Sequence, residues 1–357
     1  MKLNRYKWLL FPVLAIVTFA ITEIAPYNRH FVEVVYSQAI YPVVASALSA
    51  VSTIFPFSLD DIFYVFLVVG AVVLLLFLVF RKIAFKRAGK IVLNFLAAVY
   101  LFFYLFWGFN YYRENVNSRL NIAEQKPDTE EFLQQLEWLI SATNQSYCKF
   151  NNFDKPTIDS LVEVSYKKCS RALKLKYPAG SRKDKGITFS RFFASAGISG
   201  YFGPFFNEVH VNTNILPIEY PFVLAHEKAH QFGVTSEAEA NFYGWLVCSQ
   251  SNSKQLRYSA NLYVLKFFLF QAVGLNGYKE IVLKLNKNVK DDFLRIQKHW
   301  DKLENEKINR VASKVNDTYL KTNKVEKGVD DYYGVVKFVM DFRLDSAFHE
   351  KYGLSFN

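Results

Sequence analysis

Residues 221–245 contain a short pattern whose residue types and spacing are suited to metal chemistry. His226, Glu227 and His230 form an H-E-x-x-H motif. Residues four apart lie on the same face of a helix, so both imidazoles can bind one divalent ion while Glu227 lies over the remaining coordination position. The pattern predicts Zn²⁺ as the cofactor, with His226 and His230 as ligands and Glu227 as the catalytic residue.

The reaction follows from the properties of such a site. A catalytic zinc keeps three protein ligands and a water whose pKa falls to roughly 7. Glu227 is expected to take the proton of that water as it attacks a carbonyl carbon, and then to pass it to the leaving amine. The predicted activity is therefore hydrolysis of a peptide or peptide-like amide bond.

A third ligand is expected on a second helix close behind the motif. Gly233 tolerates the left-handed conformation that ends a helix, and Ser236 is suited to cap a helix that begins at Glu237. Two antiparallel helices would place Glu237 beside the histidines, on a face shared with Asn241, Gly244 and Cys248. Glu237 is the predicted ligand. Glu239 and Asn241 are alternatives, either as ligands or as residues that support one.

A metzincin-type site is disfavoured, because its third ligand would fall at Ser236. The pattern Glu237-x-x-Ala240-Asn241 instead resembles the ligand helix of gluzincin-type enzymes, although the spacing after the histidines is shorter here.

Substrate binding is predicted just before the motif. Glu208, Val209, His210, Val211 and Asn212 read as a strand that could bind a substrate backbone by strand addition. His210 could instead be an extra ligand, an oxyanion donor or a packing residue. Tyr258, Tyr332 and Tyr333 are further candidates for oxyanion donors, or else core tyrosines.

These residues require a folded domain, and composition places that domain after a membrane part. The chain has 357 residues, of which 51% are hydrophobic, and most long apolar runs fall in the first 110. We expect a mainly α membrane protein with a membrane domain at 1–110 and an α+β zincin-like domain at 111–357. Transmembrane helices are predicted at about 8–24, 63–80 and 91–109, with an amphipathic segment at 30–55 that is interfacial or re-entrant.

The orientation follows from the positive-inside rule. Basic residues gather before the first span, including Lys2 and Arg5, and in the 81–90 loop, whereas 25–61 has only Arg29. The N-terminus is therefore predicted to be cytoplasmic and the catalytic domain extracytoplasmic, in a bacterial inner membrane. Cys148 and Cys169 could then form a disulfide.

Charge and periodicity narrow the remaining possibilities. The net charge of +11 is not accompanied by any nucleic-acid-binding motif, so the expected partners are the lipid bilayer and a peptide or protein substrate, with no nucleic acid. In the second domain, helices are predicted from Asp128 onward and from Pro156 to about Tyr177, with a further strand at 187–190. The oligomeric state stays open.

Several motifs along the chain resemble those of a family of bacterial inner-membrane proteins of unknown function that carry H-E-x-x-H. They are Trp107–Arg113, Ser199–Phe205, Ala225–Gly233, Glu237–Phe242, Arg257–Ser259, Val315–Leu320 and Gly328–Val329. The resemblance covers nearly the whole chain and implies a membrane-anchored, zinc metallopeptidase-like protein.

Two other interpretations of the motif differ in where the site lies and in whether it is catalytic. An intramembrane protease would need its motif inside an apolar helix, but Glu219, Lys228 and Gln231 flank this one. A non-catalytic sensor or scaffold with a zincin fold and a metal site remains the alternative to the hydrolase.

Overall fold

The chain folds into two compact units. The computed structural model describes residues 7–176 and 182–354. The first unit comprises 1–114 together with 203–208, and the second comprises 115–202 and 209–357. Both consist mainly of helices, and the second also holds most of a small three-stranded sheet. The predicted helical character is therefore confirmed at this coarse level.

The first unit contains three helical stretches that are long and apolar enough to cross a membrane. These are Lys7–Ser52, Leu59–Val79 and Phe85–Phe106. The first stretch is composed of η2 (Lys7–Leu9), α1 (Leu10–Ile24), η3 (Ala25–Asn28), α2 (Arg29–Phe31), η4 (Val32–Ile40) and α3 (Tyr41–Ser52). The others are α4 (Leu59–Val79) and α5 (Phe85–Phe106), followed by η5 (Gly108–Tyr112). Such helices fit the predicted membrane protein.

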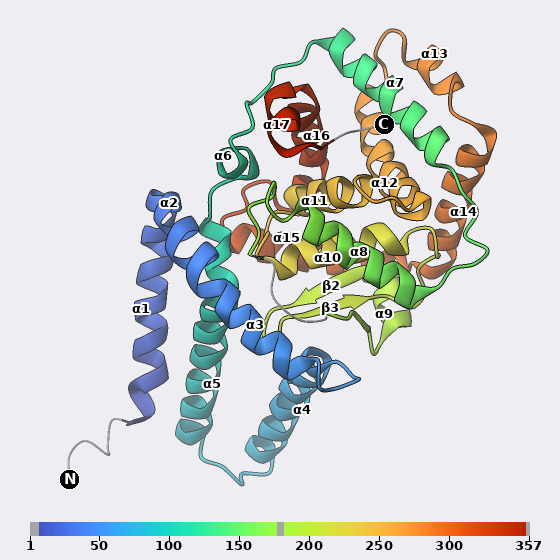
Figure 1. The fold of residues 1–357 in the computed structure, drawn as a ribbon. Helices are drawn as coiled ribbons and strands as arrows, with labels where there is room; N and C mark the ends of the chain where they lie inside the picture. The colour runs from blue at the N-terminus through green and yellow to red at the C-terminus, as the bar shows by residue number, and fades with distance from the viewer. Residues whose placement is uncertain (1–6, 177–181, 355–357) are drawn as a thin grey trace. The chain divides into compact units, whose positions relative to one another are not determined.

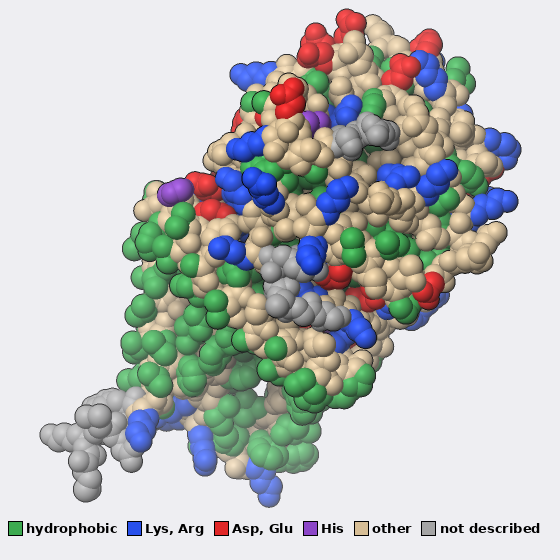
Figure 2. All heavy atoms as spheres, viewed as in Figure 1, with side chains coloured by type: hydrophobic (Ala, Val, Ile, Leu, Met, Phe, Trp, Pro, Cys, Tyr) green, Lys and Arg blue, Asp and Glu red, His purple; other side chains and the backbone are tan. Residues whose placement is uncertain are grey.

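Within this unit, α5 packs against α1, α3 and α4. Figure 1 shows α1 and α5 side by side, with α4 joined to α5 by a short loop. Large apolar side chains of these helices remain exposed, and they cover this unit in Figure 2. An apolar surface of this extent is costly in water, and it suits a hydrocarbon environment.

The 30–55 segment continues the first helical stretch instead of forming a separate element. Its middle part, η4, is π-helical, and its Glu33 carboxylate pairs with the Arg113 guanidinium through two bonds of 2.7 and 2.8 Å. Both side chains are less than a tenth exposed. Because each charge would be costly if buried alone, the pair ties η4 to the residue that follows η5.

The predicted orientation rests partly on Lys2 and Arg5, and these two residues lie outside the part of the chain that the structure describes.

The 203–208 turn is part of the first unit and is bound to the start of α4. The Glu208 carboxylate accepts hydrogen bonds from the Ser58 hydroxyl and the Asp60 amide, at 3.1 and 3.0 Å. Asp60 in turn accepts from the amides of Phe205 and Phe206, both at 3.3 Å. The bond from the Asp60 amide satisfies a donor at the N-terminus of α4 that would otherwise lack a partner, and the bonds to Asp60 satisfy two amides of the turn.

The second unit is built from helices of five to nineteen residues and most of the three-stranded sheet. The helices before the sheet are α6 (Val116–Leu120), α7 (Thr129–Ser146) and α8 (Lys155–Cys169). The central ones are α9 (Ser190–Ser195), α10 (Tyr220–Gln231), α11 (Glu237–Ser249) and α12 (Lys254–Ala272). The remainder are α13 (Tyr278–Leu283), α14 (Lys287–Leu303), α15 (Glu306–Thr322), η6 (Gly328–Gly334), α16 (Val335–Leu344) and α17 (Ser346–Tyr352).

The core of this unit lies around α10, α11 and α12, which contact one another in all three pairs (Figure 1). Gly244 of α11 permits the closest approach, since a Cβ there would lie only 3.2 Å from the backbone nitrogen of His226. Helix α7 packs on α12 and has Asp128 as its N-cap, where the sequence predicts a helix start; the structure adds a capping box between Asp128 and Glu131. Helix α8 ends at Cys169, earlier than predicted, and Tyr177 lies outside the described residues.

The sheet has the strand order β1 (Lys185–Gly186), β3 (Glu208–Val211), β2 (Gly200–Gly203). Strand β1 runs parallel to β3, with Lys185 opposite His210. Strands β2 and β3 form a hairpin, because only four residues join them. The sequence predicts a strand at 187–190, whereas the structure has β1 just before it, at Lys185–Gly186.

The three cysteines are free thiols in the structure. Cys169 and Cys248 are buried, and Cys148 is partly buried. Burial raises the pKa of the Cys169 thiol to about 12, so it stays protonated and behaves as a small apolar side chain. The disulfide between Cys148 and Cys169 that the sequence allowed is therefore not formed.

Candidate functional site

Helix α10 brings the two motif histidines together. Pro221 lies in its first turn, and every residue from Tyr220 to Gln231 is buried. His226 and His230 lie one turn apart, with their Nε2 atoms 3.1 Å from each other. Glu227 joins them, and one potential ligand atom from each of the three residues lies within 4.8 Å of the others.

The turn after α10 sets the orientation of His230. Gly233 adopts a φ of +79°, so the chain reverses there at little steric cost. The reversal places the Val234 carbonyl 2.7 Å from Nδ1 of His230. A carbonyl oxygen can only accept, so Nδ1 carries the proton and donates it. When the ring is neutral, as in a metal-binding histidine, its lone pair is then on Nε2, the atom that faces His226.

Helix α11 adds a carboxylate to the histidine pair. Its N-cap is Ser236, whose Oγ accepts from the Glu239 amide, so Glu237 is the first helical residue. Oε2 of Glu237 lies 3.2 Å from Nε2 of His226 and 3.5 Å from Nε2 of His230. Two ligands of a tetrahedral ion with bonds of roughly 2.0–2.1 Å are about 3.3 Å apart. The three atoms are therefore spaced as ligands of one such ion would be.

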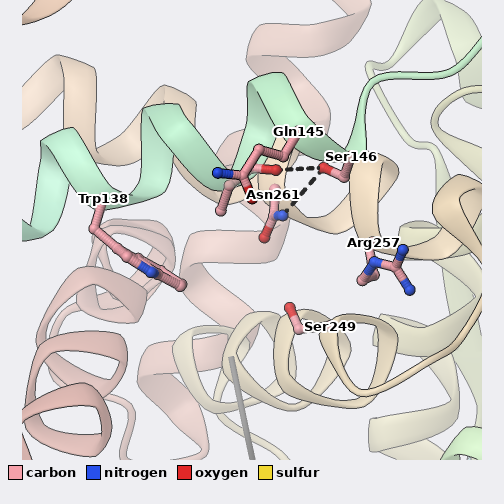
Figure 3. A pocket seen from close by; sticks show the side chains of 7 residues that line it. Trp138, Gln145, Ser146, Ser249, Arg257 and Asn261 are labelled. Carbon is pink, nitrogen blue, oxygen red and sulfur yellow. Dashed lines mark hydrogen bonds between the residues drawn. The ribbon is translucent and has the colours of Figure 1, made fainter. Parts of the chain in front are cut away.

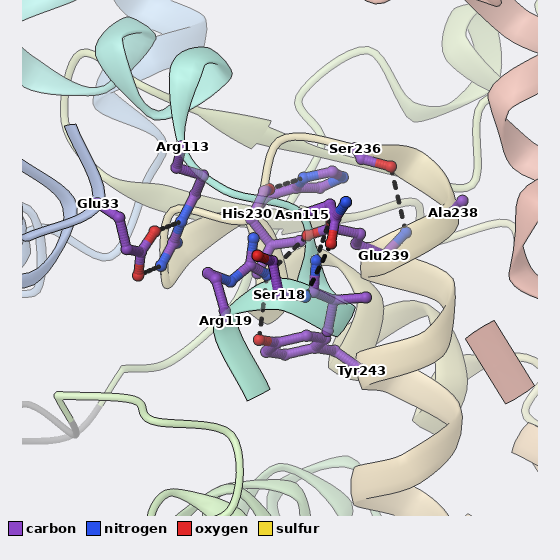
Figure 4. A network of polar contacts seen from close by, with 12 residues as sticks. Glu33, Arg113, Asn115, Ser118, Arg119, His230, Ser236, Ala238, Glu239 and Tyr243 are labelled. Atoms are coloured by element: carbon purple, nitrogen blue, oxygen red, sulfur yellow. Dashed lines mark hydrogen bonds and ion pairs between the residues drawn. The ribbon is translucent and has the colours of Figure 1, made fainter. Parts of the chain in front are cut away.

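Glu239, the alternative ligand, has other partners. Its Oε2 lies 2.6 Å from Nη2 of Arg119, and its Oε1 accepts from the Val116 amide at 2.9 Å (Figure 4). Arg119 also donates to the Tyr243 hydroxyl. These contacts attach α6 to α11, so that of the two α11 glutamates Glu237 is the one beside the histidines. The role of each glutamate toward a metal stays a prediction.

Asn241 lies one turn after Glu237 and is fully buried. Neither its Oδ1 nor its Nδ2 finds a hydrogen-bond partner within the described part of the chain. Nδ1 of His226 is likewise buried and has no such partner there. Buried polar atoms without a hydrogen-bond partner are uncommon in proteins. Asn241 and Nδ1 of His226 could therefore still form hydrogen bonds to a ligand or to water.

Glu227 lies between α10 and strand β2. A Cβ on Gly200 would lie 2.7 Å from its Oε1, so only glycine leaves space for the carboxylate at that point of the strand. Burial raises the pKa of Glu227, and the Glu237 charge raises it further, while the two histidines oppose the shift. The carboxyl group is thus held against the sheet, beside both imidazoles.

The histidines and Glu237 also affect one another's ionisation. Burial alone would lower the pKa of His230, but the Glu237 and Glu227 carboxylates outweigh it and raise that pKa to about 9. Burial opposes ionisation of Glu237 as well, yet both imidazoles hold its pKa well below the usual range. Without a metal, the cluster is an ion pair within the protein.

Residues 208–212 do not provide the free strand edge that the sequence predicts. Strand β3 is central, with β1 on one side and β2 on the other, so its backbone groups are already paired. The His210 ring is fully buried and stacks on Tyr201 at 4.2 Å. Asn212 donates to the carbonyls of Ser190 and Ile198. Strand β2 is at the edge of the sheet, so one side of its backbone is not paired with any other strand that the structure describes. Its Gly200 lies next to Glu227, so the strand edge near Glu227 belongs to β2 and not to β3.

Segment η6 supports the start of α11. The Asp331 carboxylate accepts from the Ser236 hydroxyl at 2.7 Å and from the Ala238 amide at 3.2 Å. The Tyr332 side chain lies close to Glu237, and burial and the charge of that carboxylate raise the pKa of its hydroxyl. No sequence pattern connects η6 with a motif about a hundred residues earlier, so sequence reasoning identified Tyr332 only as one tyrosine among three.

The other two tyrosines have structural partners. Tyr258 is buried and donates to Asp292 at 2.7 Å. Tyr333 packs its ring on Phe270 and Phe267. Tyr263, which was not predicted, stacks on Phe222 of α10 at 3.8 Å and lies near the charges of Glu237 and Glu227.

A family model described as a protein of unknown function (DUF3810) matches residues 36–340. The match spans part of the first unit and most of the second. It agrees with the resemblance to a family of unknown function that the sequence motifs indicate. No curated protein and no solved structure matches the chain.

Proposed function

The chain belongs to the DUF3810 family, and we propose that it is a membrane-anchored, zinc-dependent metallopeptidase. The observation that carries this proposal is the spacing of three atoms. Nε2 of His226, Nε2 of His230 and Oε2 of Glu237 lie 3.1–3.5 Å apart, close to the edge of a tetrahedron around zinc. Two imidazoles and a carboxylate form a ligand set typical of hydrolytic zinc sites.

Each residue has a specific task in this proposal. When bound, zinc would lower the pKa of a water and polarise the carbonyl of the substrate. Glu227 would accept the proton of the attacking water and deliver it to the leaving nitrogen, since its carboxylate lies beside both histidines. The Val234 carbonyl and the Tyr332 hydroxyl would hold His230 and Glu237 in place.

The proposed substrate is a peptide or peptide-like amide in an extended conformation. Strand β2 replaces β3 as the proposed binding edge, because Gly200 lies against Glu227 and an extended chain can add to an outer strand. The basic 81–90 loop supports a cytoplasmic side for that loop, and hence an extracytoplasmic catalytic unit in a bacterial inner membrane.

A non-catalytic metal-binding sensor or scaffold is the second candidate. It is favoured by the burial of His226, Glu227 and His230, each less than a tenth exposed. A closed metal site of this kind would hold zinc without admitting a substrate.

Metal analysis and a cleavage assay on the same proteins separate the two candidates. The full-length protein is purified as wild type, His226→Ala and Glu227→Gln, with His30→Ala as a control at an exposed histidine in the first unit. Each is measured for zinc content and tested on a mixed peptide library. The peptidase proposal expects zinc in all but His226→Ala, and cleavage only in wild type and His30→Ala.

Two results would count against the peptidase. Zinc at full occupancy with no cleavage by the wild type would favour the sensor or scaffold. A wild type that binds no divalent metal would refute both candidates and leave the histidine pair as a buried ion pair with Glu237.

A further inference from the structure

A polar cavity lies in the second unit at the opposite end of α11 from the histidines. It has a volume of about 160 Å³ and is enclosed by α7, the end of α11 and the first half of α12. Its polar and aromatic lining consists of Trp138, Gln145, Ser146, Ser249, Arg257 and Asn261. Figure 3 shows these side chains around one common space. Ser249 follows Glu237 by twelve residues, or about 18 Å of helix, so the cavity is separate from the histidine cluster.

Arg257 brings a positive charge that the protein does not neutralise locally. Its Nη1 donates to the Ser251 carbonyl at 2.6 Å. In the described ranges, no carboxylate lies within ion-pair distance of it, and no other acceptor is bonded to it. A guanidinium carries five N–H donors in a planar fork, so most of its donors remain for a ligand.

The other groups around the cavity add donors. The Ser249 hydroxyl is buried and makes no hydrogen bond to any described residue. Asn261 uses its Oδ1 to accept from Trp245 at 3.2 Å, which leaves the amide nitrogen on the cavity side, where it contacts Ser146 at 3.4 Å. The lining contains no carboxylate. A cavity with a cation, several donors and no anion is complementary to a negatively charged ligand.

A purely structural role for Arg257 explains only part of this arrangement. Its bond to Ser251 places a positive charge near the end of α11, which favours the helix dipole. That bond uses one N–H and accounts neither for the open volume nor for the buried hydroxyl of Ser249. Water alone could occupy the volume, since it equals about five molecules at roughly 30 Å³ each. An anion would satisfy the same donors and also the charge.

We propose that this cavity is a binding site for a small oxyanion, either inorganic phosphate or a short carboxylate. Arg257 provides the fork that pairs with two of the oxygens, and Ser249 donates to the same ligand. The volume is below that of ordinary organic-ligand pockets, which begin near 300 Å³, so only a ligand of a few heavy atoms fits. The site does not depend on the proposed peptidase activity.

Equilibrium dialysis of the purified full-length protein tests this site directly. Radiolabelled phosphate and radiolabelled acetate are used in separate arms at constant ionic strength, so the arms identify the ligand source. The variants are Arg257→Gln and Ser249→Ala, with Arg295→Gln as the control for the loss of one positive charge elsewhere in the unit. Arg295 is exposed and already paired with Asp292. A thermal unfolding curve of each protein confirms that it is folded.

The expected result is saturable binding of one anion per chain, weakened at least tenfold by Arg257→Gln and by Ser249→Ala but not by Arg295→Gln. If Arg257→Gln does not fold, the proposal is tested with Ser249→Ala and with Arg257→Lys, which keeps the positive charge but loses the planar fork of donors. Both variants should then weaken anion binding. The proposal is overturned if the wild type binds neither anion saturably, or if the folded cavity variants bind as tightly as the wild type. Equal weakening by Arg295→Gln would also overturn it, because binding would then reflect net charge.

Discussion

Glu237 and Glu239 are two residues apart, yet the structure assigns them opposite consequences when each is changed to glutamine. Glu237 lies at the histidines, with Oε2 at 3.2 and 3.5 Å from their Nε2 atoms. Glu239 is paired with Arg119 at 2.6 Å, and the two side chains are only 7% and 3% exposed. The first change should lower metal affinity most, and the second should lower stability more than it lowers metal affinity.

The cost of Glu239→Gln can be estimated from that burial. Removing one partner of a buried pair leaves the other charge uncompensated and costs about 3–5 kcal/mol of unfolding free energy. The bond from the Val116 amide can survive, because glutamine keeps a carbonyl oxygen. In a domain of about 150–250 residues, each kcal/mol lowers Tm by roughly 2–4 °C, so we expect a fall on the order of 10 °C.

Glu237→Gln should act differently, because it removes a charged donor from the proposed ligand set. Loss of a residue that merely supports a ligand reduces metal affinity by about 10–100-fold, and loss of a ligand should exceed this. Zinc affinity is measured by competition with a chelator, and stability by thermal unfolding of the metal-free proteins. The ligand assignment is wrong if Glu237→Gln retains wild-type zinc affinity while Glu239→Gln loses it. The burial argument is wrong if Glu239→Gln unfolds at the wild-type temperature.

Three further predictions concern residues around the same cluster. Gly200→Ala should abolish peptide cleavage but retain zinc. The added Cβ would lie only 2.7 Å from Oε1 of Glu227, so the carboxylate would have to move away. Unchanged cleavage would contradict this prediction. Tyr332→Phe should reduce zinc affinity by up to about 10–100-fold, because it removes the hydroxyl beside the proposed ligand Glu237, and an unchanged chelator competition curve would refute it. The metal-free protein should lose stability on both sides of a window. The raised pKa of His230 contributes stability that is complete below 6.5 and lost as pH rises through about 9, and the lowered pKa of Glu237 contributes stability that is complete above 4.5 and lost in acid. Unfolding curves that show no decline above pH 9 would contradict the assigned ion pair.

The order of elements could be predicted from local sequence. The uncharged run at 63–80 has no other stable environment than lipid or a large core, and the structure places α4 there. Asp128, Gly233 and Ser236 occupy the helix ends that their chemistry favours. Such signals depend only on neighbouring residues, so they can be read without a fold.

The spacing of the proposed metal ligands is also determined in part by the local sequence. His226 and His230 must share a helix face once α10 forms, and a short turn at Gly233 must return the chain toward them. The choice between Glu237 and Glu239 is different. It depends on Arg119, which lies more than a hundred residues earlier and draws Glu239 into an ion pair. A lone arginine in a short polar segment gives no sign of that partner.

Tertiary structure alone decided which strand has a free edge. The residues of 208–212 read as a strand in isolation, but β1 and β2 pair with both of its sides. Strand order results from hydrogen bonds between segments distant in the chain. The residue pattern within one strand does not show which strands lie on either side of it. The same reason applies to Tyr332 at Glu237 and to the cavity at Arg257. Each joins segments distant in the chain, and contacts of that kind are determined by packing rather than by any local pattern.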